Sequence, residues 1–299
     1  MLKIAVIITC HNRKHYTLDC LAHLFKAREE YNVADQKMKL FIFLTDDGCT
    51  DGTSTAVNRT FLNESIEILN GNGNLYWAGG MRMAWSYALN TSMCFDYFLL
   101  LNDDTMMEHN AFEELFRTQE YCIREYGKSG IITGLIAAND DRNVITYGGK
   151  LFDSRFKGTD FGVGESSVPQ LCDMANSNIM LVPAEVVSKI GIFYSGYVHA
   201  AADYDYSIRA RRKRIPVLAT CKICGRCDYD HPDEISKANT VISMTLSERK
   251  NYFKNPVHLR VDYLTYIRRT AVLRYPGAVI LNYLNIYFPK CYYILKGII

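Results

Sequence analysis

The sequence predicts an α/β fold with a mostly parallel central sheet flanked by helices. Short apolar runs rich in β-branched residues alternate with segments of helical periodicity. The runs at 4–9, 40–44 and 97–101 are almost entirely apolar, which is typical of strands buried on both faces. Strands that alternate with helices favour parallel pairing, with helices covering both sides of the sheet.

The elements follow one another in a regular order. After the first strand, an apolar face at i, i+3, i+4 and i+7 predicts a helix: Leu18, Leu21, Ala22 and Phe25. The second strand at 40–44 precedes a polar turn. The run at 65–69 predicts a third strand, and a glycine- and asparagine-rich loop leads from it to a helical pattern at 81–89. The strand at 97–101 is followed, after Asn102, by two aspartates.

Length and composition limit the classes of protein. The 299 residues, of which 48% are hydrophobic, suffice for one large domain or two modest ones. A charged helical tail begins near residue 233, so we expect one domain over 1–232 and a C-terminal helical extension over 233–299. The net charge of +2 gives no case for a nucleic-acid partner.

The chain shows no export signal or membrane span. Its first residues resemble a buried strand rather than a signal peptide. No window reaches the roughly 20 apolar residues that a spanning helix needs. We therefore expect a cytoplasmic protein, in which the ten cysteines are mostly reduced.

Polar turns follow three of the predicted strands, at 9–13, 46–53 and 102–105. In sheets of this class, ligands bind beyond the carboxyl ends of the strands. The three turns are therefore expected to lie together along one edge and to form a binding site.

Two of these turns carry paired acids. Asp103 and Asp104 follow a buried strand, and such a pair can hold Mg²⁺ or Mn²⁺ with one carboxylate while the other bonds a sugar hydroxyl. The alternative is a solvated turn with an aspartate as helix cap. Asp46 and Asp47 occupy the equivalent place after the second strand. They are suited to accept the N3–H of a uracil or thymine ring, or they belong to an ordinary Asp-Gly turn.

Five stretches resemble, in order, those of the family 2 glycosyltransferases, which have the GT-A (nucleotide-diphospho-sugar transferase) fold. They are VIITCHNR, LTDDGCTDGT, GNGNLYWAGGMRMAW, LLLNDDT and AADYDYSIRARRKR, and they span about residues 3–232. The YWAGGMR loop is most similar to that of bacterial members that handle rhamnose or galactofuranose.

The resemblance implies roles for individual residues. Asp103 would face the ribose, and Asp104 would be the metal ligand on the diphosphate. Asp203 would be the catalytic base, although Ala202 stands where the family usually has Glu. The nucleotide would be bound by residues of the turns and of the glycine-containing loop: Thr9, Asn12, Arg13, Asp46, Asp47, Asn74, Gly79, Arg82 and Asp103.

The residues around the sugar are less sharply defined. Trp77 is expected to stack on a sugar or to pack, and Arg82 to pair with a phosphate or with Asp47. Asn176 and Asn178 are expected to line the donor sugar or the acceptor. Asp205 is assigned to the same sugar region, with the alternative that it caps its helix or pairs with an arginine.

His231 and a run of cysteines raise the question of a second metal. His231 lies where many relatives have a third metal ligand, or it is a surface histidine. Cys221, Cys224 and Cys227 invite a zinc interpretation with His231 or Cys172 as fourth ligand. We favour buried free thiols, since one three-cysteine run cannot easily surround a tetrahedral ion.

The tail after residue 255 interleaves arginines with aromatic and aliphatic residues. This pattern suits peripheral contact with an anionic membrane surface, on its inner face. The alternatives are packing on the catalytic domain or on a second copy in a homo-oligomer.

The sequence thus predicts an inverting glycosyltransferase with a UDP- or dTDP-sugar donor, Mg²⁺ or Mn²⁺, and an Asp general base. The acceptor would be a glycan or a lipid-linked hydroxyl in bacterial surface polysaccharide synthesis. Two alternatives are a nucleotidyltransferase of the same fold class and an inactive sugar-nucleotide-binding scaffold. The first usually has a glycine-rich loop after the first strand, where this chain has TCHNRKHYT.

Overall fold

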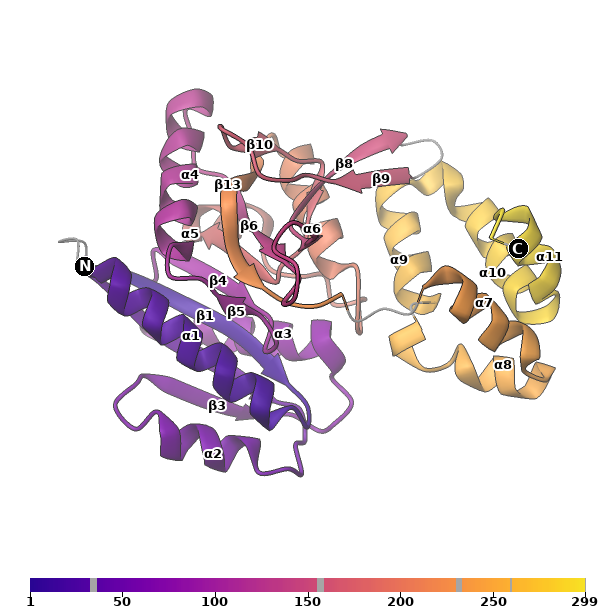
Figure 1. Cartoon of the computed structure of the whole chain (residues 1–299), viewed down its shortest axis with the longest axis horizontal. Helices are drawn as coiled ribbons and strands as arrows, with labels where there is room; N and C mark the ends of the chain where they lie inside the picture. Colours follow the sequence, from indigo (N-terminus) through magenta and orange to yellow (C-terminus); the bar gives the residue numbers. More distant parts are fainter. Residues whose placement is uncertain (33–36, 155–158, 230–232, 259, 299) are drawn as a thin grey trace.

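The computed structural model describes residues 1–32, 37–154, 159–229, 233–258 and 260–298. Its first half alternates strands and helices (Figure 1). In chain order these are β1 (Leu2–Cys10), α1 (Lys14–Asn32), β2 (Met38–Asp46), α2 (Thr53–Thr60), β3 (Ile66–Asn70), α3 (Tyr76–Asn90), β4 (Tyr97–Leu101), β5 (Met106–Met107) and α4 (Ala111–Tyr126).

The second half adds shorter strands and then helices alone. The elements are β6 (Ile131–Ala137), β7 (Ile145–Tyr147), β8 (Gly149–Ser154), β9 (Thr159–Gly162), β10 (Gln170–Leu171), β11 (Met174–Ala175), β12 (Ile179–Pro183), α5 (Ala184–Ile190), α6 (Ala202–Arg212) and β13 (Val217–Arg226). The chain continues with α7 (Glu234–Ser243), α8 (Leu246–Tyr252), η1 (Pro256–His258), α9 (Arg260–Thr270), η2 (Val272–Arg274), α10 (Tyr275–Tyr287) and α11 (Pro289–Leu295).

The central sheet confirms the predicted α/β class. Its strands lie in the order β10-β13-β6-β12-β4-β1-β2-β3, and the run from β4 to β3 is parallel. β12 lies between β4 and β6 and is antiparallel to both. A separate three-stranded sheet has the order β11-β8-β9.

Helices cover both faces of the sheet because its strands are apolar on both sides. In β1, Val6 and Ile8 belong to the core under α1 and α4, whereas Ile7 belongs to the core under α3 and α6. Trp85 of α3 is fully buried in the second core, and its ring packs on those of Phe193 and Tyr206, with centroids 5.4 Å away in each case.

Helix α3 begins earlier than the periodicity predicts. The glycine-containing loop was expected to stay irregular up to residue 81, yet the helix already includes Gly79 and Gly80. Gly80 brings α3 close to β1, since an added Cβ would lie 2.0 Å from Thr9 Oγ1. The helix starts at this point because the amides of Leu75 and Tyr76 are bonded to the side chain of Asp47, in the turn after β2.

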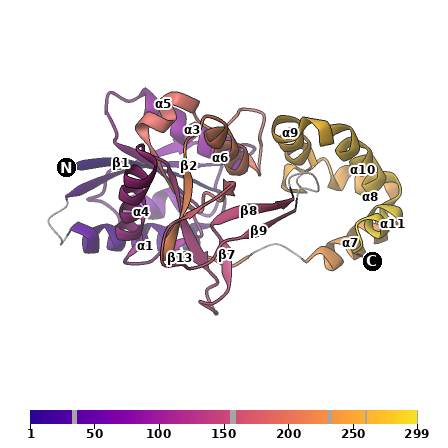
Figure 2. The same cartoon turned by 90° about the horizontal axis from the view of Figure 1, so that it is seen from above.

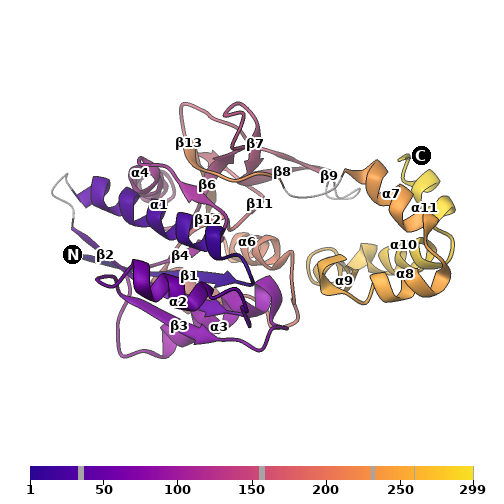
Figure 3. The same cartoon turned by 60° about the horizontal axis from the view of Figure 1, so that its bottom comes forward.

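The C-terminal helices lie to one side of the sheet, next to α6, in all three views (Figures 1, 2 and 3). They have a small apolar core of their own, formed by Ala238, Val241, Phe253, Ile286 and Tyr293. Among the described residues, no helix is both long and apolar enough to cross a membrane.

The contact of α3 with β1 predicts the effect of Gly80→Ala. The new methyl group would collide with Thr9, whose β-branched side chain is stiff. We expect a loss of about 1–3 kcal/mol in the free energy of unfolding, measured by urea denaturation. Gly79→Ala is the matched control, since its Cβ would come no closer than 3.3 Å to Leu75 Cβ. Equal effects of the two substitutions would contradict this packing.

Candidate functional site

The three polar turns do meet at one edge of the sheet. β1 pairs with β2 so that Cys10 lies opposite Asp46, and β1 also pairs with β4 in parallel. β12 enters at the same edge, because Ile179 at its start lies opposite Leu101 at the end of β4. The carboxyl ends of the parallel strands and the start of β12 therefore surround a common region.

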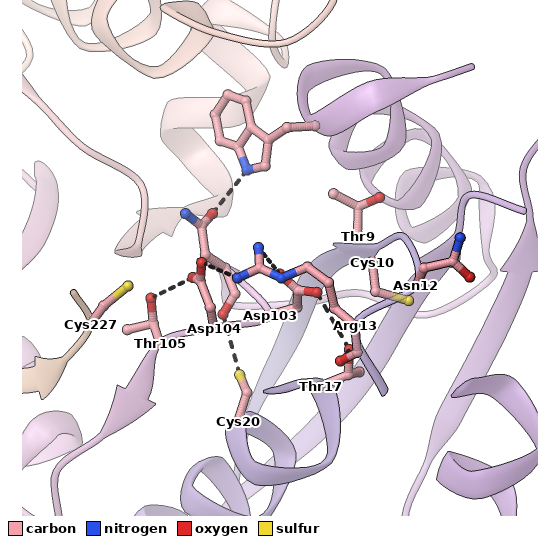
Figure 4. Close-up of polar contacts among 12 residues, drawn as sticks. Thr9, Cys10, Asn12, Arg13, Thr17, Cys20, Asp103, Asp104, Thr105 and Cys227 are labelled. Carbon is pink, nitrogen blue, oxygen red and sulfur yellow. Dashed lines mark hydrogen bonds and ion pairs between the residues drawn. The ribbon is translucent and has the colours of Figure 1, made fainter. Parts of the chain in front are cut away.

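Arg13 joins two of these turns (Figure 4). Its guanidinium donates a hydrogen bond of 2.7 Å to Asp104 Oδ2 and lies 3.3 Å from Asp103 Oδ1. The opposite charge explains how two neighbouring carboxylates are tolerated at the end of a buried strand. The structure therefore brings together three residues that the sequence assigned to the nucleotide and the metal.

Asp103 and Asp104 differ in their surroundings. Asp103 is 5% exposed, and burial raises its pKa to about 7, although Arg13 opposes this shift and Asp104 adds to it. Thr17 on the first turn of α1 also lies 3.4 Å from Asp103 Oδ2. Asp104 is more open, with a side-chain exposure of 20%. Asp104 is thus the carboxylate that is more accessible to a ligand.

Asp46 and Asp47 both form bonds within the protein. Asp46 accepts bonds from the amide of Cys49, at 2.6 Å, and from the Ser54 hydroxyl. Asp47 is 3% exposed and accepts three backbone N–H groups. The donors are Gly73 at 2.8 Å, Leu75 at 2.9 Å and Tyr76 at 3.0 Å. Asp47 thus holds the turn and the start of α3 together, and its contact with a base stays a prediction.

The other residues of the glycine-containing loop lie around this start. Tyr76 has a positive φ of 54°, a conformation that non-glycine residues rarely adopt, and Asp47 bonds its amide. Asn74 is exposed. Trp77 donates its indole N–H to Asn102 Oδ1 at 2.9 Å, and its ring packs on Phe193. The structure favours packing for Trp77 and leaves Asn74 accessible.

Thr9 and Asn12 hold the first turn. Thr9 is 8% exposed, and its hydroxyl lies 3.3 Å from the carbonyl of Thr45. Asn12 has a positive φ of 51°, and its Oδ1 accepts the amide of Thr50 at 2.7 Å. Both residues are at the edge, but the side chain of Asn12 is bonded to the next turn.

Arg82 does not pair with Asp47, contrary to one expectation. Its guanidinium donates to the carbonyl of Tyr197 at 2.6 Å and lies 3.4 Å from that of Tyr194. These residues precede α6, so Arg82 holds that segment against α3. Gly79 has a similar function, since its amide bonds the carbonyl of Val198 at 3.3 Å.

Asp203 lies at the start of α6 and is bonded to Ser177, just before β12 begins at the same edge of the sheet. Its Oδ2 accepts the amide of Ser177 at 3.1 Å, and its Oδ1 accepts that of Tyr204 at 2.9 Å. Burial raises the pKa of Asp203 to about 6, and these two amides and the charge of Lys150 oppose the shift. The carboxylate is thus fixed in orientation and titrates close to neutral pH.

Residues 176–178 connect Asp203 with the acids after β4. The amide of Asn102 donates to the carbonyl of Asn178 at 3.2 Å, and Asn178 Nδ2 donates to the Thr105 hydroxyl at 3.2 Å. Asn178 is 5% exposed. Asn176 donates to the Tyr204 hydroxyl at 3.0 Å. Both asparagines are close to the site, and their contacts order it; their contact with a sugar stays a prediction.

Asp205 is paired with arginine, which was the alternative to a sugar contact. It is 1% exposed, and Arg269 bonds its two oxygens at 3.1 and 3.2 Å. Arg209 Nε lies 3.6 Å from the same carboxylate. A buried carboxylate bonded in this way is not available to a sugar, so the structure gives no support to that assignment.

The cysteine run is buried, with Cys221 and Cys224 in β13 and Cys227 directly after it. Cys221, Cys224 and Cys227 are free thiols with exposures of 3%, 0% and 4%. Burial raises the pKa of Cys224 to about 12, which disfavours the thiolate that binds metals. His231, the other candidate ligand, lies outside the described residues.

Asp104 is the residue best placed to hold a divalent cation. Within the described part of the chain, no three His, Cys, Asp or Glu side chains gather as a metal cluster. Mg²⁺ and Mn²⁺ often use one or two carboxylates and take their other ligands from water and substrate phosphates. The donor set at this edge fits a cation that is bound together with its substrate.

Two residues that hold the backbone around α6 were not found from the sequence. Asp262 and Arg269 of α9 bond to the segment before α6 and to α6 itself. In the sequence they belong to a tail whose arginines and aromatic residues predict contact with a membrane surface. Their partners are about sixty residues earlier, so no local pattern marks them.

Comparison with known proteins identifies the family. The model of glycosyl transferase family 2 matches residues 5–165, which is more than half of the chain. No curated protein sequence matches the chain.

Solved structures share the fold at low sequence identity. A structure of S. aureus TarS 1-349 is 13% identical with a TM-score of 0.50, and the alignment covers 96% of this chain and 72% of that one. A second TarS structure is 14% identical with a TM-score of 0.51, and the alignment covers 90% of this chain and 43% of the TarS chain. GalNAc-T7, solved with UDP, GalNAc and Mn²⁺, is 12% identical with a TM-score of 0.53, and the coverage is 76% and 43%. The chain therefore spans less than half the length of the two longer relatives.

The match sets aside the alternative of a nucleotidyltransferase. The edge that holds the paired aspartates and Asp203, the sheet order and the family match agree with one another. The chain belongs to glycosyl transferase family 2 and is a glycosyltransferase with the GT-A fold.

Proposed function

We propose that the protein is an inverting glycosyltransferase that moves a sugar from a UDP- or dTDP-sugar to a hydroxyl group of a glycan or lipid-linked acceptor. Its proposed setting is bacterial surface polysaccharide synthesis, suggested by the resemblance of its YWAGGMR loop to bacterial enzymes. A structural neighbour, GalNAc-T7, was solved with UDP and Mn²⁺, which is consistent with a donor of this kind.

One observation carries the proposal. Asp104 and Asp203 lie at the same edge of the sheet, and a short run of hydrogen bonds connects them. The amide of Ser177 bonds Asp203, and the carbonyl of Asn178 bonds the amide of Asn102, two residues before Asp104. A diphosphate group and an acceptor hydroxyl could therefore be held next to one another.

The proposed chemistry assigns different tasks to the two acids. As the glycosidic bond to the diphosphate breaks, negative charge builds on the phosphate, and a divalent cation bound at Asp104 would stabilise it. Arg13 brings a positive charge to the same place. Asp203 accepts the proton of the acceptor hydroxyl while the oxygen of that hydroxyl attacks the anomeric carbon. A single base that acts opposite the leaving group inverts the configuration of that carbon.

The C-terminal helices are proposed to be an extension, over 233–299, that touches a membrane at its far side. Several large apolar side chains there are exposed, among them Leu273 at 95%, Leu295 at 69% and Phe288 at 62%. Basic residues lie nearby in the sequence, among them Arg274 and Lys290. This combination suits the surface of an anionic membrane, where a lipid-linked acceptor would be found.

The donor site is tested by thermal shift. UDP or dTDP with Mn²⁺, at about a hundredfold excess over the dissociation constant, should raise the melting temperature of the wild type by about 5–10 °C. Asp104→Asn should lose the metal-dependent part of the shift. Glu185→Gln is the control, since this exposed acid follows β12 at the opposite edge of the sheet. GDP and CDP serve as competing bases, and a wild type that responds to no nucleotide would contradict the proposed site.

The base is tested by the pH dependence of turnover. Asp203 accepts a proton only when it is ionised, so kcat/KM should fall tenfold per pH unit below about pH 6. Asp203→Asn should lower kcat by about 10²–10⁴-fold and leave nucleotide binding intact. Asp103→Asn should keep the fall in kcat/KM at acidic pH. If the fall disappears in that variant, the titrating group is Asp103 and not Asp203. A product that retains the anomeric configuration, seen by NMR, would exclude Asp203 as the single base.

Membrane contact is tested by flotation with anionic vesicles. The double variant Leu273→Ser and Phe288→Ser should bind about 10–100-fold more weakly. Each serine removes apolar surface whose transfer from water into the membrane favours binding. Leu62→Ser, at an 81% exposed position of the sheet domain, is the control. Vesicle binding that stays unchanged would oppose the proposal. Loss of a dimer in the double variant, measured by light scattering, would instead assign this surface to a second copy.

A further inference from the structure

Helix α9 of the extension bonds the backbone that precedes the proposed base. Asp262 is 1% exposed and accepts three consecutive amides. The donors are Val198 at 2.9 Å, His199 at 2.7 Å and Ala200 at 2.8 Å. A buried carboxylate that accepts three amides fixes the direction of each of these peptide groups.

The next residue, Ala201, has a rare backbone conformation. Its φ of 60° and ψ of 4° lie in the left-handed region, which costs an alanine about 1–2 kcal/mol. Such a conformation persists where the surrounding structure imposes it. Ala201 lies directly after the amides bound by Asp262 and two residues before Asp203, so this conformation sets the start of α6.

A second residue of α9 holds α6 itself. Arg269 bonds both oxygens of Asp205 and lies over the ring of Tyr194, 3.7 Å from its centroid. In return, Arg212 at the end of α6 donates to the carbonyls of Arg269 and Thr270, each at 2.8 Å. Helices α6 and α9 are therefore joined at both the start and the end of α6, as they lie side by side in Figure 3.

The same segment is bonded to α3 on its other side. The carbonyl of Val198 accepts the amides of Ala78 at 3.1 Å and Gly79 at 3.3 Å, and Tyr197 accepts Arg82. Residues 194–201 therefore lie between α3, which begins at the nucleotide-binding turn, and α9 of the extension. If α9 were removed, the segment would keep its contacts with α3. It would lose the bonds to Asp262 that fix the peptide groups of residues 198–200.

We propose that α9 is a positioning element of the catalytic site, in which Asp262 and Arg269 fix residues 194–201 and thereby the placement of Asp203. The inference rests on the proposed function of Asp203 as general base. Asp262 and Arg269 are positioning residues, since they act through the backbone of this segment and through Asp205. The extension would thus be required for turnover whether or not it also touches a membrane.

The experiment uses the full-length protein with Asp262→Asn and Arg269→Lys. Asparagine keeps the size of the side chain, but its amide nitrogen cannot accept an N–H group. Amide hydrogen exchange at residues 198–200 should accelerate in Asp262→Asn and stay unchanged in β1 and β4. Each variant should lower kcat by about 10–100-fold with the KM for the donor within twofold, as expected for a displaced base.

Asp233→Asn is the matched control. This aspartate caps α7 of the same extension by accepting the amides of Ile235 and Ser236, but α7 is separate from the segment before α6. It should change neither kcat nor exchange at 198–200. Faster exchange at 198–200 with unchanged kcat, or no change in either, would overturn the inference. Failure of the proposed function would look different, because Asp203→Asn would then keep wild-type turnover while the exchange at 198–200 still accelerates in Asp262→Asn.

Discussion

Backbone amides that donate to buried carboxylates are the interaction on which this site depends. Asp47, Asp203 and Asp262 together accept eight backbone N–H groups in the turns and segments around the site. Hydrogen bonds to an ionised acceptor are stronger than neutral ones, and a buried amide without its acceptor costs about 1–3 kcal/mol. Each carboxylate therefore fixes a loop that the sheet alone would leave undetermined.

The same bonds account for the unusual backbone of the site. Tyr76 and Ala201 both have positive φ angles, and each lies directly beside amides bound by an aspartate, Asp47 in one case and Asp262 in the other. Strained residues of this kind gather where a precise arrangement is needed. The two strained points are connected, because Val198, held by Asp262, accepts the amides at the start of α3.

The paired acids illustrate how charge is balanced where the chain requires two carboxylates side by side. Arg13 immediately precedes α1, and its guanidinium contacts both Asp103 and Asp104. In the first turn of α1, at the positive end of the helix dipole, the Thr17 hydroxyl also lies 3.4 Å from Asp103 Oδ2. Burial nevertheless dominates at Asp103 and raises its pKa to about 7.

The sequence predicted those features that depend on local pattern. Continuous apolar runs gave the strands, and polar turns at their ends gave the edge that carries Asp103 and Asp104. The beginning of α3 was predicted too late, because the amides that start it bond Asp47, some 29 residues earlier. Asp262 and Arg269 were missed for the same reason, as their meaning arises only when α9 packs on α6. Periodicity carries no information about such distant pairs.

The position of α9 in the chain has a consequence for biosynthesis. A growing polypeptide emerges from the ribosome from its N-terminus, at about 5–20 residues per second, and domains tend to fold in that order. Every strand of the sheet is complete by Arg226, whereas Asp262 and Arg269 follow more than thirty residues later. A nascent chain can therefore assemble the turns at the edge of the sheet before it can set the backbone that precedes α6. In the proposed scheme, donor recognition would mature first, and the capacity for transfer would follow only when α9 has left the ribosome.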